Sequence, residues 1–187
     1  MAIERLPEPP AVVVVELTKM RRRHLRRVLS IEGRVYPRPW SASLFLSELA
    51  QRSTRSYLVA RHDGDVVGYA GLMFSGPEAH VTNIAVDPDF HGRKIGSRLL
   101  LAIVTEAIAR GAESISLEVR VKNLAAQSMY QKFGFSIVST RKGYYIETNE
   151  DAYVMVAENV RSTGYRMVLQ SIRAELDELG AIEGGDV

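Results

Sequence analysis

The chain has 187 residues, of which 46% are hydrophobic and 25% charged, with a formal net charge of +2. This length and composition are typical of one folded domain with a substantial core. The sequence contains no cysteine, which excludes disulfides, a thiolate zinc site and a cysteine acyl-enzyme. Its four histidines, His24, His62, His80 and His91, lack metal-ligand spacing, so we expect no metal site.

The apolar runs are too short to span a membrane. Those at Val12–Val15 and Leu99–Val104 fall well below the roughly 20 residues that a bilayer requires. The N-terminus is acidic and proline-rich, unlike a signal peptide. We therefore expect a cytoplasmic protein that does not bind membranes.

The N-terminal part alternates a strand and two helices. We predict a strand over Val12–Leu17 and an amphipathic helix over Lys19–Glu32. Prolines stiffen a loop over Tyr36–Trp40. Ser41 can then cap a short helix.

A cluster of positive charge falls on the predicted first helix. It consists of Lys19, Arg21, Arg22, Arg23, Arg26 and Arg27. Such runs are most often solvated helix faces. The alternative is docking on an acidic partner or on ribosomal RNA (rRNA).

The middle of the chain predicts a hairpin followed by a strand. Tyr57–Arg61 and Val66–Phe74 flank an Asp63-Gly64 turn. A short apolar strand over Ile84–Val86 ends at Asp87-Pro88-Asp89.

The turn that follows this strand suits phosphate. A helical pattern begins near Ile95, and the amides between Gly92 and Ser97 have no partner in the first helical turn. These amides and the helix dipole favour an anion, to which Arg93 and Lys94 add positive charge. Similar turns also occur in α/β proteins that bind nothing there.

A second segment combines a strand carboxylate with a helix tyrosine. After a helix over Ser97–Arg110 that ends at Gly111, residues Ile115–Val121 alternate as a strand. Glu118 lies opposite the apolar row of that strand. Without further information, Glu118 reads most simply as a solvated residue paired with Arg120 or a lysine on the next strand.

The C-terminal part adds two helices and two strands. Asn123 can cap a helix whose inner stripe includes Tyr130 and which ends at Gly134. The last strands are expected over Phe135–Thr140 and Ala152–Ala157. An amphipathic helix is predicted over Tyr165–Leu179, and the final residues, Gly184-Gly185-Asp186-Val187, are predicted to be disordered.

Together these segments resemble the GNAT superfamily of N-acetyltransferases, and within it the RimI-type N-terminal acetyltransferases. The resemblance rests on Tyr36–Ser41, Thr82–Pro88, Leu117–Arg120, Asn123, Tyr130, Gly134-Phe135 and Gly143–Met155. It implies a mixed α/β (α+β) fold whose central, mostly antiparallel sheet is flanked by helices and splays at the acetyl-CoA site. It spans about residues 12–157, leaving an N-terminal extension over 1–11 and a C-terminal extension over 158–187.

The resemblance implies roles for particular residues. Glu118 would be the general base and Tyr130 the general acid, although Tyr130 could also be a core-edge aromatic. Acetyl-CoA would be held by Ile84, Ala85, Val86, Gly92, Arg93, Lys94, Ile95, Gly96, Ser97 and Asn123, with the N–H of Val86 or a neighbour facing the oxyanion. His91 and Lys94 depart from the family's loop pattern. We expect Lys94, which replaces a glycine, to keep a negative φ.

The acceptor would enter between two aromatic segments. Tyr36 and Trp40 are expected on one side and Tyr144 and Tyr145 on the other, although these rings could merely seal the core edge. The expected reaction is acetylation of a protein N-terminus, with a ribosomal protein as the candidate substrate. The alternatives are acetylation of a small amine or lysine, or a non-catalytic acetyl-CoA-binding module. A protruding C-terminal helix would also allow a homodimer.

Overall fold

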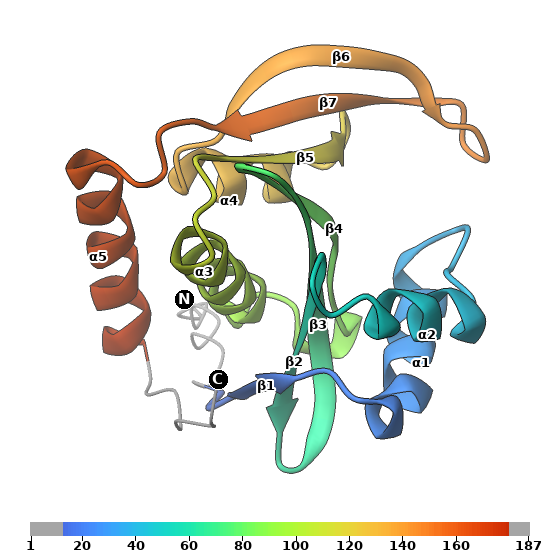
Figure 1. Ribbon diagram of the computed structural model, residues 1–187. Coiled ribbons are helices and arrows are strands. Elements are labelled where there is room, and N and C mark those ends of the chain that lie inside the picture. The colour runs from blue at the N-terminus through green and yellow to red at the C-terminus, as the bar shows by residue number, and fades with distance from the viewer. Residues whose placement is uncertain (1–12, 180–187) are drawn as a thin grey trace, which may run out of the picture.

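A seven-stranded sheet forms the centre of the computed structural model, which describes residues 13–179 (Figure 1). The strands lie in the order β1-β2-β3-β4-β5-β7-β6. Every neighbouring pair is antiparallel except β4 and β5. Their bounds are β1 Glu16–Lys19, β2 Arg55–His62, β3 Asp65–Ser75, β4 Glu78–Val86, β5 Ser114–Arg120, β6 Ser136–Tyr145 and β7 Glu150–Ala157. The expected mixed, mostly antiparallel sheet is confirmed.

Helices cover both faces of this sheet. Figure 1 shows α1 and α2 on one side, and α3 and α5 on the other. The helices are α1 Leu25–Val35, α2 Ala42–Ala50, α3 Ile95–Ala109, α4 Leu124–Lys132 and α5 Thr163–Glu178, with short 3-10 turns at Arg22–His24 and Pro88–Phe90. Buried side chains form one core beneath α1 and α2 and a larger one around α3, α4 and α5.

Several predicted boundaries are confirmed because short-range capping sets them. Ser41 and Asn123 each accept a hydrogen bond from the backbone N–H three residues ahead, at the start of α2 and α4. Gly111 and Gly134 follow α3 and α4 with φ values of 91° and 81°. The turn between β2 and β3 falls at Asp63–Gly64, with positive φ at both residues.

The predicted N-terminal boundaries are wrong. The first strand, expected over Val12–Leu17, runs over Glu16–Lys19, and Val12 lies outside the described residues. The helix expected from Lys19 begins only at Leu25, after the 3-10 turn. The reason is pairing with β2: Lys19 lies opposite Leu58, and the N–H of Met20 donates to the carbonyl of Tyr57 (2.8 Å). Lys19 is therefore on a strand, apart from the arginines.

The C-terminal helix is present as α5 and belongs to the main core. Its buried residues Tyr165, Ile172 and Leu176 join the cluster around α3. The Tyr165 hydroxyl donates to the carbonyl of Phe133 at the end of α4 (2.8 Å), and Arg98 of α3 donates to the carbonyl of Leu176 (2.7 Å). The predicted tail, Gly184 to Val187, lies outside the described residues, and the homodimer stays a prediction. Within residues 13–179 no helix is both long and apolar enough to cross a bilayer.

Candidate active site

The central cavity opens where β4 and β5 separate. The two strands pair only over Glu78–His80 and Ser114–Ser116, although they continue to Val86 and Arg120. A cavity of about 870 Å³ lies between the diverging parts. The expected splay of two adjacent strands is therefore confirmed.

All the candidate site residues line this one cavity. They come from the α1–α2 loop, β4, the start of α3, β5, α4 and the end of β6. They are Tyr36, Trp40, Ile84, Ala85, Val86, Gly92, Arg93, Lys94, Ile95, Gly96, Ser97, Glu118, Asn123, Tyr130, Tyr144 and Tyr145. The structure thus brings them together, while their individual roles stay predictions.

Along the part of β4 that does not pair with β5, backbone N–H and C=O groups point into the cavity. The N–H of Asp87 donates to a β3 carbonyl (2.8 Å). Because backbone groups along a strand point alternately to its two sides, those of Ile84 and Val86 point away from β3. The Ile84 carbonyl accepts from the Tyr36 hydroxyl (2.9 Å), and the Val86 carbonyl contacts His91 Nε2 (3.0 Å). The N–H groups of Ile84 and Val86 therefore face the opening between the strands.

The turn after β4 presents further amides. The first intrahelical hydrogen bond of α3 runs from the N–H of Arg98 to the carbonyl of Lys94 (3.0 Å). The amides of Ile95, Gly96 and Ser97 therefore lie ahead of the helical ladder, at the positive end of the helix dipole. A Cβ atom at Gly96 would lie 3.5 Å from Met129 Sδ, which is an ordinary contact distance.

The expected backbone conformation of Lys94 is wrong. Its φ is +59°, in the left-handed region that favours glycine, and it occupies the N-cap of α3. The backbone of this turn has a positive φ at Gly92 (+77°) and again at Lys94. The geometry therefore places the lysine in a glycine-like conformation, with its side chain exposed.

A glycine at this position should fit better than the native lysine. A left-handed conformation costs an L-residue about 1–2 kcal/mol, which glycine avoids while losing about 0.5–1 kcal/mol to chain entropy. We expect Lys94→Gly to melt at the same or a higher temperature and to bind coenzyme A at least as tightly, measured by thermal unfolding and calorimetry. Lys94→Ala is the control, since it removes the charge but keeps the strain. Weaker binding by both variants would show that the ammonium group contacts a phosphate.

Glu118 is a largely covered carboxylate that lies between the His80 imidazole and the Arg141 guanidinium. Its side chain is only 10% exposed, its Oε2 lies 3.1 Å from His80 Nε2, and its Oε1 lies 3.2 Å from an Arg141 nitrogen. The hydrogen bond from His80, with smaller help from the Arg141 charge, holds the pKa of Glu118 below its ordinary value although burial opposes this. The simplest interpretation from sequence, a solvated residue paired with Arg120 or a lysine on the next strand, is wrong. Arg120 instead pairs with Glu147 and Glu150.

Tyr130 is a buried phenol that lines the same cavity. It is 5% exposed, and its ring lies against that of Phe135, with 5.9 Å between centroids. Burial raises the pKa of Tyr130, so its hydroxyl keeps its proton throughout the neutral and mildly alkaline range. The cavity therefore contains an ionised carboxylate and a protonated phenol.

The α1–α2 loop is anchored by a buried carboxylate. Glu32, on α1, accepts hydrogen bonds from the backbone N–H of Trp40 (2.9 Å) and from the hydroxyl of Tyr69. Burial raises the pKa of Glu32 to about 7. The Trp40 ring packs on Phe45, with 5.3 Å between centroids, and also lines the cavity. Trp40 thus closes the core edge and walls the cavity at once.

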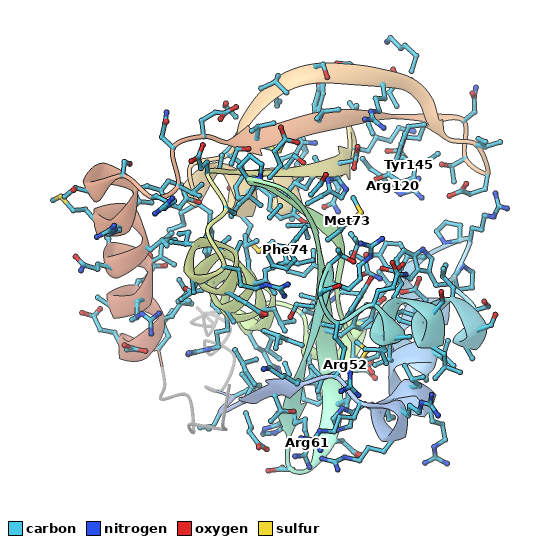
Figure 2. The ribbon with its side chains drawn as sticks, in the orientation of Figure 1. Arg52, Arg61, Met73, Phe74, Arg120 and Tyr145 are labelled. Carbon is cyan, nitrogen blue, oxygen red and sulfur yellow. The ribbon has the colours of Figure 1, made fainter. Side chains whose placement is uncertain are left out.

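The end of β6 supplies the facing wall. The rings of Tyr144 and Tyr145 are perpendicular, with 5.1 Å between centroids. The guanidinium of Arg120 lies 3.8 Å from the centre of the Tyr145 ring and also pairs with Glu150 (3.0 Å). Figure 2 shows Arg120 and Tyr145 together beneath the far end of the β6–β7 hairpin, on the side toward α2.

The profile of the Acetyltransferase (GNAT) family matches residues 25–135. The chain belongs to the GNAT acetyltransferase family. The matched region contains the turn over residues 92–97, here named the phosphate-type turn, together with Glu118 and Tyr130. The chain is therefore an acetyl-CoA-dependent N-acetyltransferase, as predicted.

The RimI resemblance is confirmed as well. The acetyltransferase is 37% identical over 147 residues to the N-alpha-acetyltransferase RimI of Mycobacterium tuberculosis, covering 75% of this chain and 90% of that protein. It is 35% identical over 127 residues to the [ribosomal protein bS18]-alanine N-acetyltransferase of Escherichia coli K12, covering 67% and 84%. The crystal structure of the E. coli ribosomal-protein-S18-alanine N-acetyltransferase superposes with a TM-score of 0.72 and 30% identity, covering 78% and 94%.

Sequence reasoning missed several cavity residues of this acetyltransferase. Among the polar ones are Glu32, His80 and Asn83. His80 reaches Glu118 because β4 and β5 pair in parallel with His80 opposite Ser116, two residues before Glu118. That register depends on the pairing of segments far apart in the sequence, and no local sequence pattern predicts it. Only one sequence feature could have pointed to Glu32 as a site residue: it is a carboxylate among the buried residues of an amphipathic helix.

Proposed function

We propose that this acetyltransferase moves the acetyl group of acetyl-CoA to the α-amino group of a protein N-terminus, with a ribosomal protein as the candidate substrate. The observation that carries the proposal is that Glu118 and Tyr130 line the same cavity as the phosphate-type turn. The acceptor class is supported by the two RimI-type relatives, whose own names specify α-amino or alanine acetylation.

The residues present fit acetyl-CoA, which supplies the acetyl thioester. The amides of Ile95, Gly96 and Ser97 suit its diphosphate, with Gly92 shaping the turn and Arg93 adding charge. Ile84, Ala85 and Val86 provide the strand edge along which the pantetheine arm would lie. Asn123, fixed by capping α4, would contact that arm.

Glu118 acts as the base in this proposal. An N-terminal amine has a pKa of about 7.7–8.0, so a useful fraction is already neutral at physiological pH. A carboxylate with a lowered pKa is a weak base toward a free ammonium group, yet it can accept the proton that nitrogen sheds as it bonds to carbon. His80 and Arg141 hold the carboxylate in place and ionised.

Tyr130 acts as the acid, and Val86 stabilises negative charge. The phenol, protonated at neutral pH, would donate to the departing sulfur. The N–H of Val86 faces the gap between β4 and β5, where a fixed backbone donor can meet a developing oxyanion without reorganising. The expected location in the cytoplasm stays a prediction.

The function is tested by a panel of acceptors. Purified protein and acetyl-CoA are incubated with N-terminal peptides that differ in their first residue, with an N-terminally blocked peptide containing lysine, and with small amines, and thiol release is measured. The proposal expects turnover of free N-termini only. Turnover of small amines with failure of every peptide would remove the N-terminal assignment and leave the acetyltransferase assignment intact.

We further propose that the exposed arginines before and at the start of α1 contact an anionic surface, with rRNA as the candidate. Arg21, Arg22 and Arg26 are exposed, and no ion pair joins them to any residue within 13–179. Arg27 differs, since it pairs with the buried Asp87 (3.4 Å).

Salt dependence tests this contact. Each phosphate neutralised contributes about 0.7–0.9 to the slope of log affinity against log salt. We expect rRNA binding with a steep slope that becomes about 2–3 units shallower when Arg21, Arg22 and Arg26 are all changed to glutamine, measured by fluorescence anisotropy. Binding that is equally weak for both proteins, or insensitive to salt, would show that these arginines form only a solvated face.

A further inference from the structure

Arg141 reaches Glu118 from the edge strand of the sheet. β6 is the last strand in the sheet and pairs with β7, which in turn pairs with β5. Glu118 lies opposite Val154 of β7, and Val154 lies opposite Ser139 of β6. Arg141 comes two residues after Ser139, so its side chain is on the same face as Glu118. It crosses β7 and places a guanidinium nitrogen 3.2 Å from Glu118 Oε1.

The two oxygens of the Glu118 carboxylate have different neighbours. Oε2 lies 3.1 Å from the imidazole Nε2 of His80, while Oε1 faces Arg141. The Glu118 side chain is 10% exposed and lines the cavity, whereas that of Arg141 is 55% exposed and is not one of the lining residues. The Arg141 guanidinium also lies 5.5 Å from the centre of the Tyr144 ring. Arg141 thus contacts the carboxylate from the solvent side, opposite to the approach of an acceptor.

The other ionisable groups around the carboxylate leave Arg141 as its permanent cationic partner. Three phenols stay protonated at neutral pH because burial raises the pKa of each, and these are Tyr130, Tyr144 and Tyr145. Two groups line the cavity from the side of α1, namely Glu32 and Arg38. Arg120, on the same face of β5, pairs with Glu147 and Glu150. Within residues 13–179 the ion-pair partners of Glu118 are His80 and Arg141, of which only the guanidinium is always charged.

A carboxylate without a cationic partner would hold an acceptor amine in the wrong form. The amine must be neutral to attack the thioester, yet a lone anion stabilises the ammonium form and raises the pKa of the amine. An amine hydrogen-bonded to Oε1 would lie within about 6 Å of the Arg141 nitrogen, the sum of the two contacts. At that distance a guanidinium repels an ammonium group and leaves a neutral amine unaffected.

We propose that Arg141 cancels the charge of Glu118, so that the acceptor amine is bound in its neutral, reactive form. This inference rests on the proposed function, since it takes Glu118 as the base, and it extends that site to a residue outside the cavity. Arg141 acts through Glu118 and is therefore a positioning residue, not a catalytic one. Glu118 can still accept the proton that nitrogen loses on bonding to carbon, because the exposed guanidinium stays hydrated when its partner becomes neutral.

The pH dependence of Arg141→Gln tests the inference with an N-terminal peptide as acceptor. Without the guanidinium the unreactive ammonium form binds more tightly, so we expect kcat and KM to fall together by about 3–10-fold at pH 7. The value of kcat/KM, which refers to the free amine, should stay within about two-fold of the wild type. The kcat profile should move up by about 0.5–1 pH unit and meet the wild-type profile above about pH 9, where the amine is neutral in both proteins.

Two variants serve as controls for this shift. Arg141→Lys keeps the positive charge and should keep the wild-type profile. Lys142→Gln removes a charge from the next residue, which is 84% exposed and pairs with Asp151 (2.7 Å), and should change neither kcat nor KM. Glu32, whose pKa of about 7 falls in the assay range, is present in every variant, so its titration does not produce a difference between them.

A less basic acceptor gives a second, independent comparison. The two peptides begin with 2-aminobutyrate and with its 4,4,4-trifluoro analogue, whose fluorines withdraw electrons and leave the amine largely neutral at pH 7. We expect Arg141→Gln to lower kcat and KM with the first peptide and to match the wild type with the second. An equal loss of kcat with both peptides, or a loss that persists above pH 9, would overturn the inference and place Arg141 in the chemical step or the fold. Unchanged kcat and KM with both would identify the Arg141 contact as a surface ion pair without effect.

The outcomes also separate this inference from the proposed function. If the wild type acetylates small amines but no peptide, the N-terminal assignment fails, and the same pH comparison with the acetylated amine decides the role of Arg141. If peptides are acetylated and the profiles of Arg141→Gln and the wild type coincide, the N-terminal activity stands and only the inference is lost.

Discussion

Glu118→Gln is expected to lower kcat by about 10²–10³-fold while leaving coenzyme A affinity within about two-fold of the wild type. Glutamine keeps the size of the side chain but cannot take the proton from the reacting nitrogen. The ion-pair partners of Glu118, His80 and Arg141, lie outside the phosphate-type turn, so cofactor binding should persist. Turnover is measured as thiol release with an N-terminal peptide, and affinity by calorimetry.

The pH profile distinguishes this role from a structural one. Since the pKa of Glu118 lies below its ordinary value of 4.5, the carboxylate stays ionised throughout the assay range. Wild-type kcat/KM should therefore rise with pH and level off near the amine pKa of about 7.7–8.0, not near that of a carboxyl group. The lowered pKa also stabilises the fold above pH 4.5, and this stabilisation is lost as the pH falls through the native value.

His80 offers a matched control for the same prediction. His80→Gln should raise the pKa of Glu118, since the hydrogen bond from His80 is the largest cause of its lowering. This variant keeps the base, so we expect a loss of activity smaller than that of Glu118→Gln and dependent on pH. A Glu118→Gln enzyme that turned over at the wild-type rate at pH 8 would show that the carboxylate only pairs with His80 and Arg141.

Local patterns predicted those parts of the fold that depend on neighbouring residues. The segment from Asn123 to Gly134 was predicted in full, because a side-chain cap begins its helix and a glycine at positive φ ends it. The alternation in β5 placed Glu118 opposite its apolar row, and the observed burial pattern agrees. Between them these segments supplied the proposed base and acid.

Local patterns could not predict the features that depend on pairing with distant segments. The apolar stretch Ile84–Val86 is only the end of a strand that begins at Glu78, and the polar residues before it pair with β3 and β5. The left-handed conformation of Lys94 was missed because a lysine rarely adopts it without the constraint of a tight turn. The hydrogen-bond partners of Glu32, which are Trp40 and Tyr69, lie on other segments.

Tyr130→Phe is the other change with a large expected effect. Loss of the phenolic proton donor should lower kcat by about 10²-fold, with little change in KM or in coenzyme A affinity. Phenylalanine preserves the packing of the ring against Phe135, so the melting temperature should stay close to that of the wild type. Burial raises the pKa of Tyr130, and wild-type kcat should therefore show no alkaline loss attributable to this residue up to about pH 9.

Tyr165→Phe is the matched control, because it removes another buried phenol that also contacts α4. The Tyr165 hydroxyl donates to the carbonyl of Phe133 (2.8 Å), so its loss should destabilise the fold by about 0.5–1.5 kcal/mol and leave kcat nearly unchanged. The two variants should thus separate, with Tyr130→Phe affecting turnover and Tyr165→Phe affecting stability. Near-normal turnover by Tyr130→Phe would identify its ring as a core-edge aromatic, and the proton on the leaving sulfur would have to come from solvent.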